Sequence, residues 1–137
     1  MLYPMFAMVL LTFAVAIRLF SLRVKAVKAG KMRLSQFRLN TGDTPDEMAQ
    51  AARNYANLFE VPMLFYTAGA IAIALGIQTL PLIIAAWIFV IARCIHSWIH
   101  LHSNNVINRM RAYMLGNICI LVIWCLLVAS YAMRATL

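Results

Sequence analysis

Four long apolar runs constrain this chain of 137 residues more than any other feature of its sequence. Each run approaches the roughly 20 residues that a helix needs to cross about 30 Å of hydrocarbon. The chain is 64% apolar and only 12% charged, whereas water-soluble domains are about half apolar and about a quarter charged. We therefore predict an all-α integral membrane protein, an up-down four-helix bundle in a single domain. The expected spans are about 2–22, 55–76, 81–101 and 113–133, with loops 23–52 and 102–112 on one side.

The basic residues predict the orientation of these spans. The formal charge is +8, from 12 Lys and Arg against four Asp and Glu, and eight of the cations lie between Arg18 and Arg53. The positive-inside rule places both charged loops in the cytoplasm, so both termini are expected on the non-cytoplasmic side. Because topology accounts for the charge, no nucleic-acid partner is expected.

The second span is expected to begin before it enters the membrane. Thr44 and Glu47 have the spacing of a capping box, with a proline at the first helical position. The helix would then run to Gly76, about 31 residues or near 46 Å, which exceeds the thickness of the hydrocarbon. Pro62 removes the hydrogen bond to the carbonyl of Leu58, which predicts a kink.

Two stripes of polar residues occur at the expected cytoplasmic ends of the second and third spans. Ionisable groups in such positions are costly and are functional candidates by default. Spaced three or four residues apart, the members of each stripe lie on one face of their helix. Antiparallel neighbours bring the stripes to a similar depth, which predicts one polar pocket. The stripes are Arg53, Asn57 and Glu60, and Arg93, His96 and His100.

The residue types in these stripes favour an anion as ligand. They contain two arginines, which bind carboxylates well, but only one carboxylate. A structural alternative is that the polar side chains only hold the helices together. His96 and His100 have the spacing of a helical metal-ligand pair, but the flanking arginines would repel a cation, so no metal is expected.

Two motifs resemble those of a known family. Residues 53–62 resemble the R-x-x-x-N-x-x-E-x-P signature of the MAPEG family, the membrane-associated proteins in eicosanoid and glutathione metabolism. Residues 92–96 resemble its A-R-x-x-H element, and the likeness in length, spans and basic first loop covers nearly the whole chain. Many eukaryotic members have a tyrosine where this chain has His100, and segment 96–106 is more similar to the bacterial branch. The resemblance implies a homotrimer, and we expect it in a bacterial inner membrane.

The resemblance also implies a glutathione site near the cytoplasmic face, between neighbouring subunits, with glutathione as co-substrate. In the short loop after the third span, Arg109 is the candidate for the arginine that activates the thiol. Arg111 competes for this role because the register across the loop is open. By position, the residues implied to bind glutathione are Arg33, Arg53, Asn57, Glu60, Arg93, His96 and His100.

Known members of the family conjugate glutathione to lipophilic electrophiles, reduce lipid hydroperoxides or isomerise lipid endoperoxides, and one binds lipid without catalysis. We therefore expect a glutathione transferase or lipid hydroperoxide peroxidase, whose lipophilic small-molecule substrate arrives through the membrane lipids. The alternative is a non-catalytic lipid-binding or scaffolding protein of the same fold. A small transporter or channel is disfavoured because no polar stripe reaches the outer half of any span.

Overall fold

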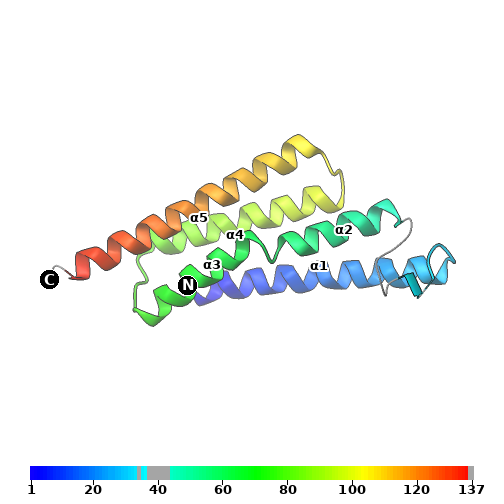
Figure 1. Ribbon diagram of the computed structural model, residues 1–137. Coiled ribbons are helices and arrows are strands. Elements are labelled where there is room, and N and C mark those ends of the chain that lie inside the picture. Colours follow the sequence, from blue (N-terminus) through cyan, green and yellow to red (C-terminus); the bar gives the residue numbers. More distant parts are fainter. Residues whose placement is uncertain (34, 37–43, 136–137) are drawn as a thin grey trace.

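The chain folds into helices that are arranged as four long rods (Figure 1). The computed structural model describes residues 1–33, 35–36 and 44–135. Two of the helices, α2 and α3, follow one another along the second rod, so the five α-helices of these residues form four rods. The predicted all-α four-helix fold is therefore confirmed. The helices are α1 (Leu2–Lys28), α2 (Asp46–Asn57), α3 (Val61–Ala74), α4 (Leu80–Leu101) and α5 (Val106–Ala135).

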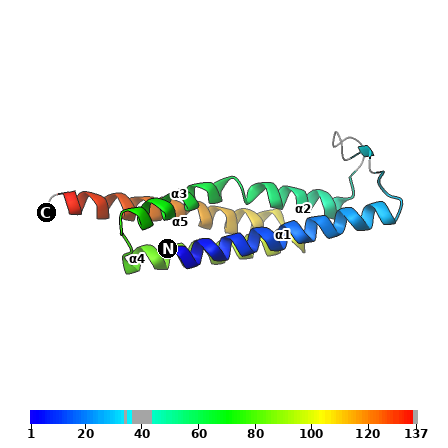
Figure 2. The same cartoon turned by 90° about the horizontal axis from the view of Figure 1, so that it is seen from below.

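Successive rods run in opposite directions, and Figures 1 and 2 agree on which connections share an end. The end of α1, the start of α2 and residues 102–105 lie at one end, which we call the basic end because α1 finishes there with Lys25 and Lys28. The start of α1 and the end of α5 lie toward the other end of the bundle (Figure 2). The side of the membrane on which the basic end lies stays a prediction.

The surface of the bundle is that of a multi-pass integral membrane protein. Four helical stretches are long and apolar enough to cross a membrane. Large apolar side chains project outward along α1, where Phe6, Phe13 and Phe20 are each more than half exposed. In water such a stripe would be unfavourable, whereas in a bilayer it contacts lipid tails.

The centre of the bundle is closely packed. Phe65 of α3 stacks on Phe89 of α4 with ring centroids 4.6 Å apart, and Met8, Leu82 and Ile123 are fully buried around them. Because lipid tails are as apolar as these side chains, close packing and polar contacts between helices, rather than transfer from water, hold the rods together.

Gly76 ends α3 with a turn that reverses the chain toward α4. Its φ of +64° lies in the left-handed region, which glycine adopts without steric cost. The amides of Gly76 and Ile77 donate to Ile73 and Ala72, the paired bonds of a Schellman motif. From the end of α5, Arg134 donates to the carbonyls of Leu75 (2.7 Å) and Gly76 (3.0 Å).

The predicted capping box at Thr44 is wrong. Pro45 has ψ of 136° and no helical geometry, so it is the N-cap residue, and α2 begins at Asp46. The carbonyl of Pro45 accepts from the amides of Met48 (2.9 Å) and Ala49 (3.0 Å), and no side chain caps the helix. The acidic residues of the first turn still lie at the positive end of the helix dipole.

The predicted continuous helix with a kink at Pro62 is also corrected, because the helix is broken. Residues 58–60 separate α2 from α3, and Glu60 has φ −87° and ψ −96°, well outside helical geometry. Pro62 lies in the first turn of α3, where its missing amide costs least. At 14 residues, α3 is about 21 Å long.

Candidate functional site

Arg93 supplies hydrogen bonds at the break between α2 and α3. The carbonyl of Asn57 has lost the intrahelical bond that Val61 would donate in an unbroken helix. The Nη2 of Arg93 reaches over from α4 and donates to this carbonyl (3.1 Å) and to the Oδ1 of the same residue. Arg93 is fully buried, so the break receives a charged donor from the interior of the bundle. Asn57 in turn donates from Nδ2 to Oε2 of Glu60 (2.9 Å).

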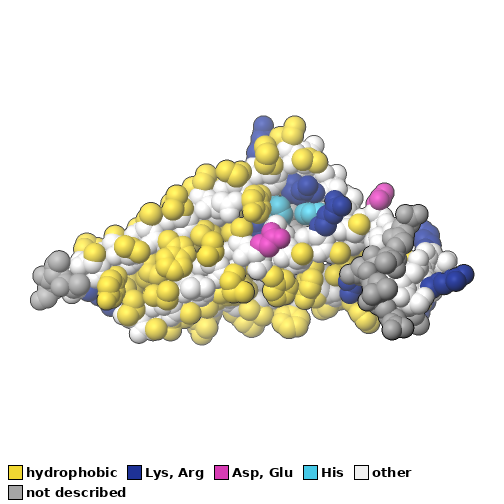
Figure 3. All heavy atoms as spheres, viewed as in Figure 1, with side chains coloured by type: hydrophobic (Ala, Val, Ile, Leu, Met, Phe, Trp, Pro, Cys, Tyr) yellow, Lys and Arg dark blue, Asp and Glu magenta, His cyan; other side chains and the backbone are white. Residues whose placement is uncertain are grey.

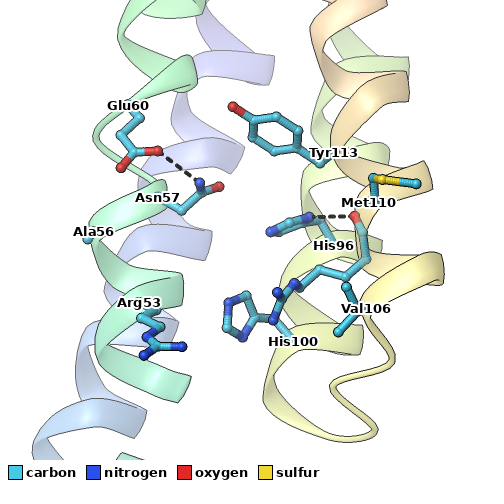
Figure 4. Close-up of a pocket in the computed structure, with 10 residues that line it drawn as sticks. Arg53, Ala56, Asn57, Glu60, His96, His100, Val106, Met110 and Tyr113 are labelled. Carbon is cyan, nitrogen blue, oxygen red and sulfur yellow. Dashed lines mark hydrogen bonds between the residues drawn. The ribbon is translucent and has the colours of Figure 1, made fainter. Parts of the chain in front are cut away.

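A cavity of about 490 Å³ opens beside this network, between α2, α4 and α5. It lies toward the basic end, where Figure 3 shows histidine, basic and acidic side chains gathered on a face that is otherwise largely hydrophobic. Figure 4 shows the side chains of Asn57 and Glu60 facing His96 and Tyr113 across it. The lining residues are Arg53, Ala56, Asn57, Glu60, His96, His100, Val106, Arg109, Met110 and Tyr113.

His96 links α4 to the start of α5. Its Nδ1 lies 3.1 Å from the carbonyl oxygen of Arg109. A carbonyl only accepts hydrogen bonds, so Nδ1 carries the proton and Nε2 is left as an acceptor. The ring reaches into the cavity from α4 (Figure 4), so the cavity gains a neutral hydrogen-bond acceptor on that wall.

Arg109 is held by a second contact. Its Nη1 donates to Oδ1 of Asn104, a non-glycine residue with a positive φ of 47°. Asparagine tolerates this left-handed geometry better than most residues. The backbone carbonyl of Arg109 is therefore held by His96 of α4, and its guanidinium is held by Asn104 of the turn between α4 and α5.

Several buried polar atoms at the site have no hydrogen-bond partner among the described residues. They include Nδ1 of His100, which lines the cavity, and Nε and Nη1 of Arg93 behind it. Asn54 accepts from the hydroxyl of Ser97 (3.2 Å), but its Nδ2 is unpaired. Unsatisfied buried donors and acceptors are costly, and these atoms lie in or behind the wall of the cavity.

The cavity combines charges of both signs. Arg53 and Arg109 supply cations from two sides, and Glu60 supplies one carboxylate. Such a set suits an elongated ligand with more negative than positive groups, since guanidinium groups pair with carboxylates and a carboxylate pairs with an amine. Within the described residues no group of three His, Cys, Asp or Glu side chains is placed to hold a metal ion.

The structure brings most of the predicted site residues together, but not all of them. Arg93 lies behind the cavity wall rather than on it. Arg33 is outside the cavity, where its amide donates to Oε1 of Gln36 (2.6 Å). Arg109 and Arg111 lie on α5 rather than in a loop, and Arg111 lines a different cavity. The predicted residues that line the cavity are Arg53, Asn57, Glu60, His96, His100 and Arg109.

Sequence reasoning missed the part of the site that α5 contributes. Val106, Met110 and Tyr113 line the cavity, but the sequence prediction began the fourth span only at residue 113. These residues are spaced three or four apart with Arg109, which places them on one face of a helix. This spacing was the signal in the sequence that could have indicated their part in the site. The ring of Tyr113 lies 5.8 Å from that of His96.

Comparison with known proteins gives one match. The family model of the MAPEG family matches residues 1–129. None of the curated proteins or solved structures that were compared matches the chain.

Proposed function

The chain belongs to the MAPEG family, and we propose that it is a glutathione-dependent enzyme, a transferase, a lipid hydroperoxide peroxidase or both, that acts on a lipophilic substrate. The family is known for glutathione-dependent and related membrane functions. The observation that carries the proposal is the cavity itself, in which both polar stripes meet Arg109.

The charges of glutathione suit this cavity. The tripeptide carries two carboxylates and one ammonium group, and the cavity offers Arg53 for a carboxylate and Glu60 for the ammonium group, while Arg109 remains for the thiol. A volume of about 490 Å³ is within the usual range for small-molecule sites. The Nε2 of His96, whose Nδ1 faces the carbonyl of Arg109, supplies a further polar contact for peptide groups.

Arg109 is our candidate for activating the thiol. The thiolate is the reactive form, and a cation near the sulfur favours it. The contacts with His96 and Asn104 hold Arg109 at the cavity. In a transferase reaction the thiolate forms a bond to an electrophilic carbon, and the leaving group departs with its electron pair. In a peroxidase reaction the thiolate attacks a peroxide oxygen, the O–O bond breaks, and the other oxygen leaves as the alcohol after protonation. The sulfenic acid formed on sulfur then reacts with a second glutathione to give the disulfide and water.

The assembly and location follow from the same proposal. We propose a homotrimer in the bacterial inner membrane, with both termini on the non-cytoplasmic side. The cavity has two cations and only one carboxylate, and we propose that a neighbouring subunit supplies the remaining groups of the site.

Ligand binding tests the first part of the proposal. Glutathione at millimolar concentration should raise the thermal midpoint of the purified wild type, because a ligand that binds only the folded state stabilises it by about 2.7 kcal/mol at 100 times its Kd. Glu60→Gln and Arg53→Gln should reduce the shift, while Lys28→Gln, remote from the cavity, should not. No shift in the wild type contradicts glutathione binding and favours the alternative, a non-catalytic lipid-binding or scaffolding protein.

Turnover tests the second part. Arg109→Ala should reduce the rate with a chromogenic electrophile or a lipid hydroperoxide far more than it weakens glutathione binding. Arg111→Ala is the informative comparison, because this cation is two residues away but lines a different cavity. Equal losses of turnover in both variants would contradict the assignment of Arg109.

A further inference from the structure

A second cavity lies between α4 and α5 on the opposite face of α5. Its volume is about 310 Å³, and it is mostly apolar. Arg109 and Arg111 are two residues apart, which is about 200° around a helix, so the first faces the candidate site and the second faces this groove. The groove is lined by Ala92, Ile95, Ile99, Asn108, Arg111, Ala112 and Leu115.

The groove is lined almost entirely by apolar surface, and the polar groups of Asn108 and Arg111 lie at its edge. Ala92 and Ala112 are buried, and their small side chains leave the hollow between the two helices. Ile95 and Leu115 flank it and are about half exposed, at 48% and 46%. Asn108 and Arg111, one turn apart on α5, lie on the side of the groove nearer the basic end.

Arg111 lies close to the basic end of the bundle. It follows the first residue of α5 by five positions, about 8 Å along the helix. A long basic side chain at this depth reaches the level of the lipid phosphates. Its side chain is exposed, and no hydrogen bond or ion pair with another described residue engages its guanidinium.

We propose that this groove is a binding site for one glycerophospholipid. The guanidinium of Arg111 and the amide of Asn108 hold the phosphate diester, and one acyl chain lies over Ala92 and Ala112 between Ile95 and Leu115. Charge complementarity favours this occupant, because the cation is at the headgroup end of the groove and the apolar floor extends toward the bilayer centre. The site is separate from the glutathione cavity and does not depend on the proposed enzyme activity.

Native mass spectrometry of the detergent-solubilised full chain tests the proposal. Phosphatidylglycerol is titrated into the wild type, Arg111→Gln, Ala112→Phe and the matched control Arg18→Gln. Arg18 is also an exposed cation near the basic end, but it lies on α1, away from the groove. Oleic acid, which has an acyl chain but no phosphate, is titrated in parallel.

Arg111→Gln should weaken phosphatidylglycerol binding about tenfold, the effect of losing one charge-assisted hydrogen bond. Ala112→Phe should weaken it by filling the hollow, and Arg18→Gln should leave it unchanged. Thermal midpoints in lipid-free detergent check that each variant is folded. Arg111→Met, which also removes the charge, replaces Arg111→Gln if that variant is not folded, and Ala112→Leu replaces Ala112→Phe.

Three results would overturn the proposal. Equal weakening by Arg111→Gln and Arg18→Gln would mean that only the overall charge attracts the lipid. Equal binding of oleic acid and phosphatidylglycerol would mean that the phosphate is not recognised. A change of oligomeric state in Ala112→Phe would identify the groove as a contact between copies of this chain.

Discussion

Replacing Arg93 with methionine should destabilise the fold by about 2 to 4 kcal/mol while leaving the lining of the cavity in place. The guanidinium donates two hydrogen bonds to Asn57, and a bond from a charged donor contributes about 1.5–3 kcal/mol. The variant also removes a buried charge whose Nε and Nη1 are unpaired. Removing this desolvation cost offsets part of the free energy lost with the two hydrogen bonds. Methionine preserves most of the side-chain volume, so cavity formation adds little.

Unfolding in mixed micelles by added sodium dodecyl sulfate, followed by tryptophan fluorescence, measures this difference as a free energy of unfolding. Arg53→Met is the matched control, because it removes the same charge from an exposed position on α2. Without ligand it should change the free energy by no more than about 0.5 kcal/mol. Adding glutathione should stabilise Arg53→Met less than it stabilises Arg93→Met, since Arg53 lines the cavity and its loss should reduce ligand stabilisation. An Arg93→Met variant as stable as Arg53→Met without ligand would refute the role of Arg93 at the break.

Three further predictions concern turns and helix ends. Gly76→Ala should destabilise the protein by about 1–2 kcal/mol, because φ is +64° at this position. Gly116→Ala should stabilise it by about 0.5–1 kcal/mol, because Gly116 is in the interior of α5 and an added Cβ would have its nearest contact at an ordinary 3.5 Å. Equal effects of the two variants in thermal unfolding would contradict the backbone argument. Arg134→Gln should cost about 1 kcal/mol by removing two donors from the end of α3, and hydrogen exchange should then rise first in that turn. Asn104→Gly relieves the positive φ but removes the acceptor for Arg109, so turnover should fall about fivefold or more with the thermal midpoint maintained; unchanged turnover would mean that this contact does not orient the guanidinium.

The periodic and compositional features of the chain were enough to predict the architecture. Long apolar runs determine the helices because a bilayer admits almost no other spanning structure without edges. The stripe spacing correctly brought Arg53, Asn57, Glu60, His96 and His100 to one cavity, since three-to-four spacing on two antiparallel helices leaves few other arrangements.

The details that failed depend on which local hydrogen bonds form. Pro62 predicts the loss of one bond, but a kink and a break differ in whether another group satisfies the freed carbonyls. Here Arg93 of α4 does so, a contact 36 residues away that no local pattern specifies. The same contact explains why Arg93 is buried behind the cavity rather than lining it.

The start of α5 was missed for a related reason. Residues 106–112 are too polar to be counted as part of a span, yet they are helical. Asn105 accepts from the amide of Asn108 (3.0 Å) through its side chain, an N-terminal cap that competes with a loop. A polar helical extension of this kind is what places Arg109 at the cavity.

The short length of α3 bears on whether a second substrate reaches the cavity from water or from the lipid bilayer. At about 21 Å this helix cannot cross roughly 30 Å of hydrocarbon alone, so the break and the cavity beside it lie below the membrane surface. In the proposed reaction, glutathione comes from water while its partner comes from the lipid. The concentration of this lipophilic substrate at the cavity is then set by its partition coefficient. At a fixed total amount of lipophilic substrate, adding empty vesicles should raise the apparent KM for that substrate by surface dilution. The apparent KM for glutathione should not change.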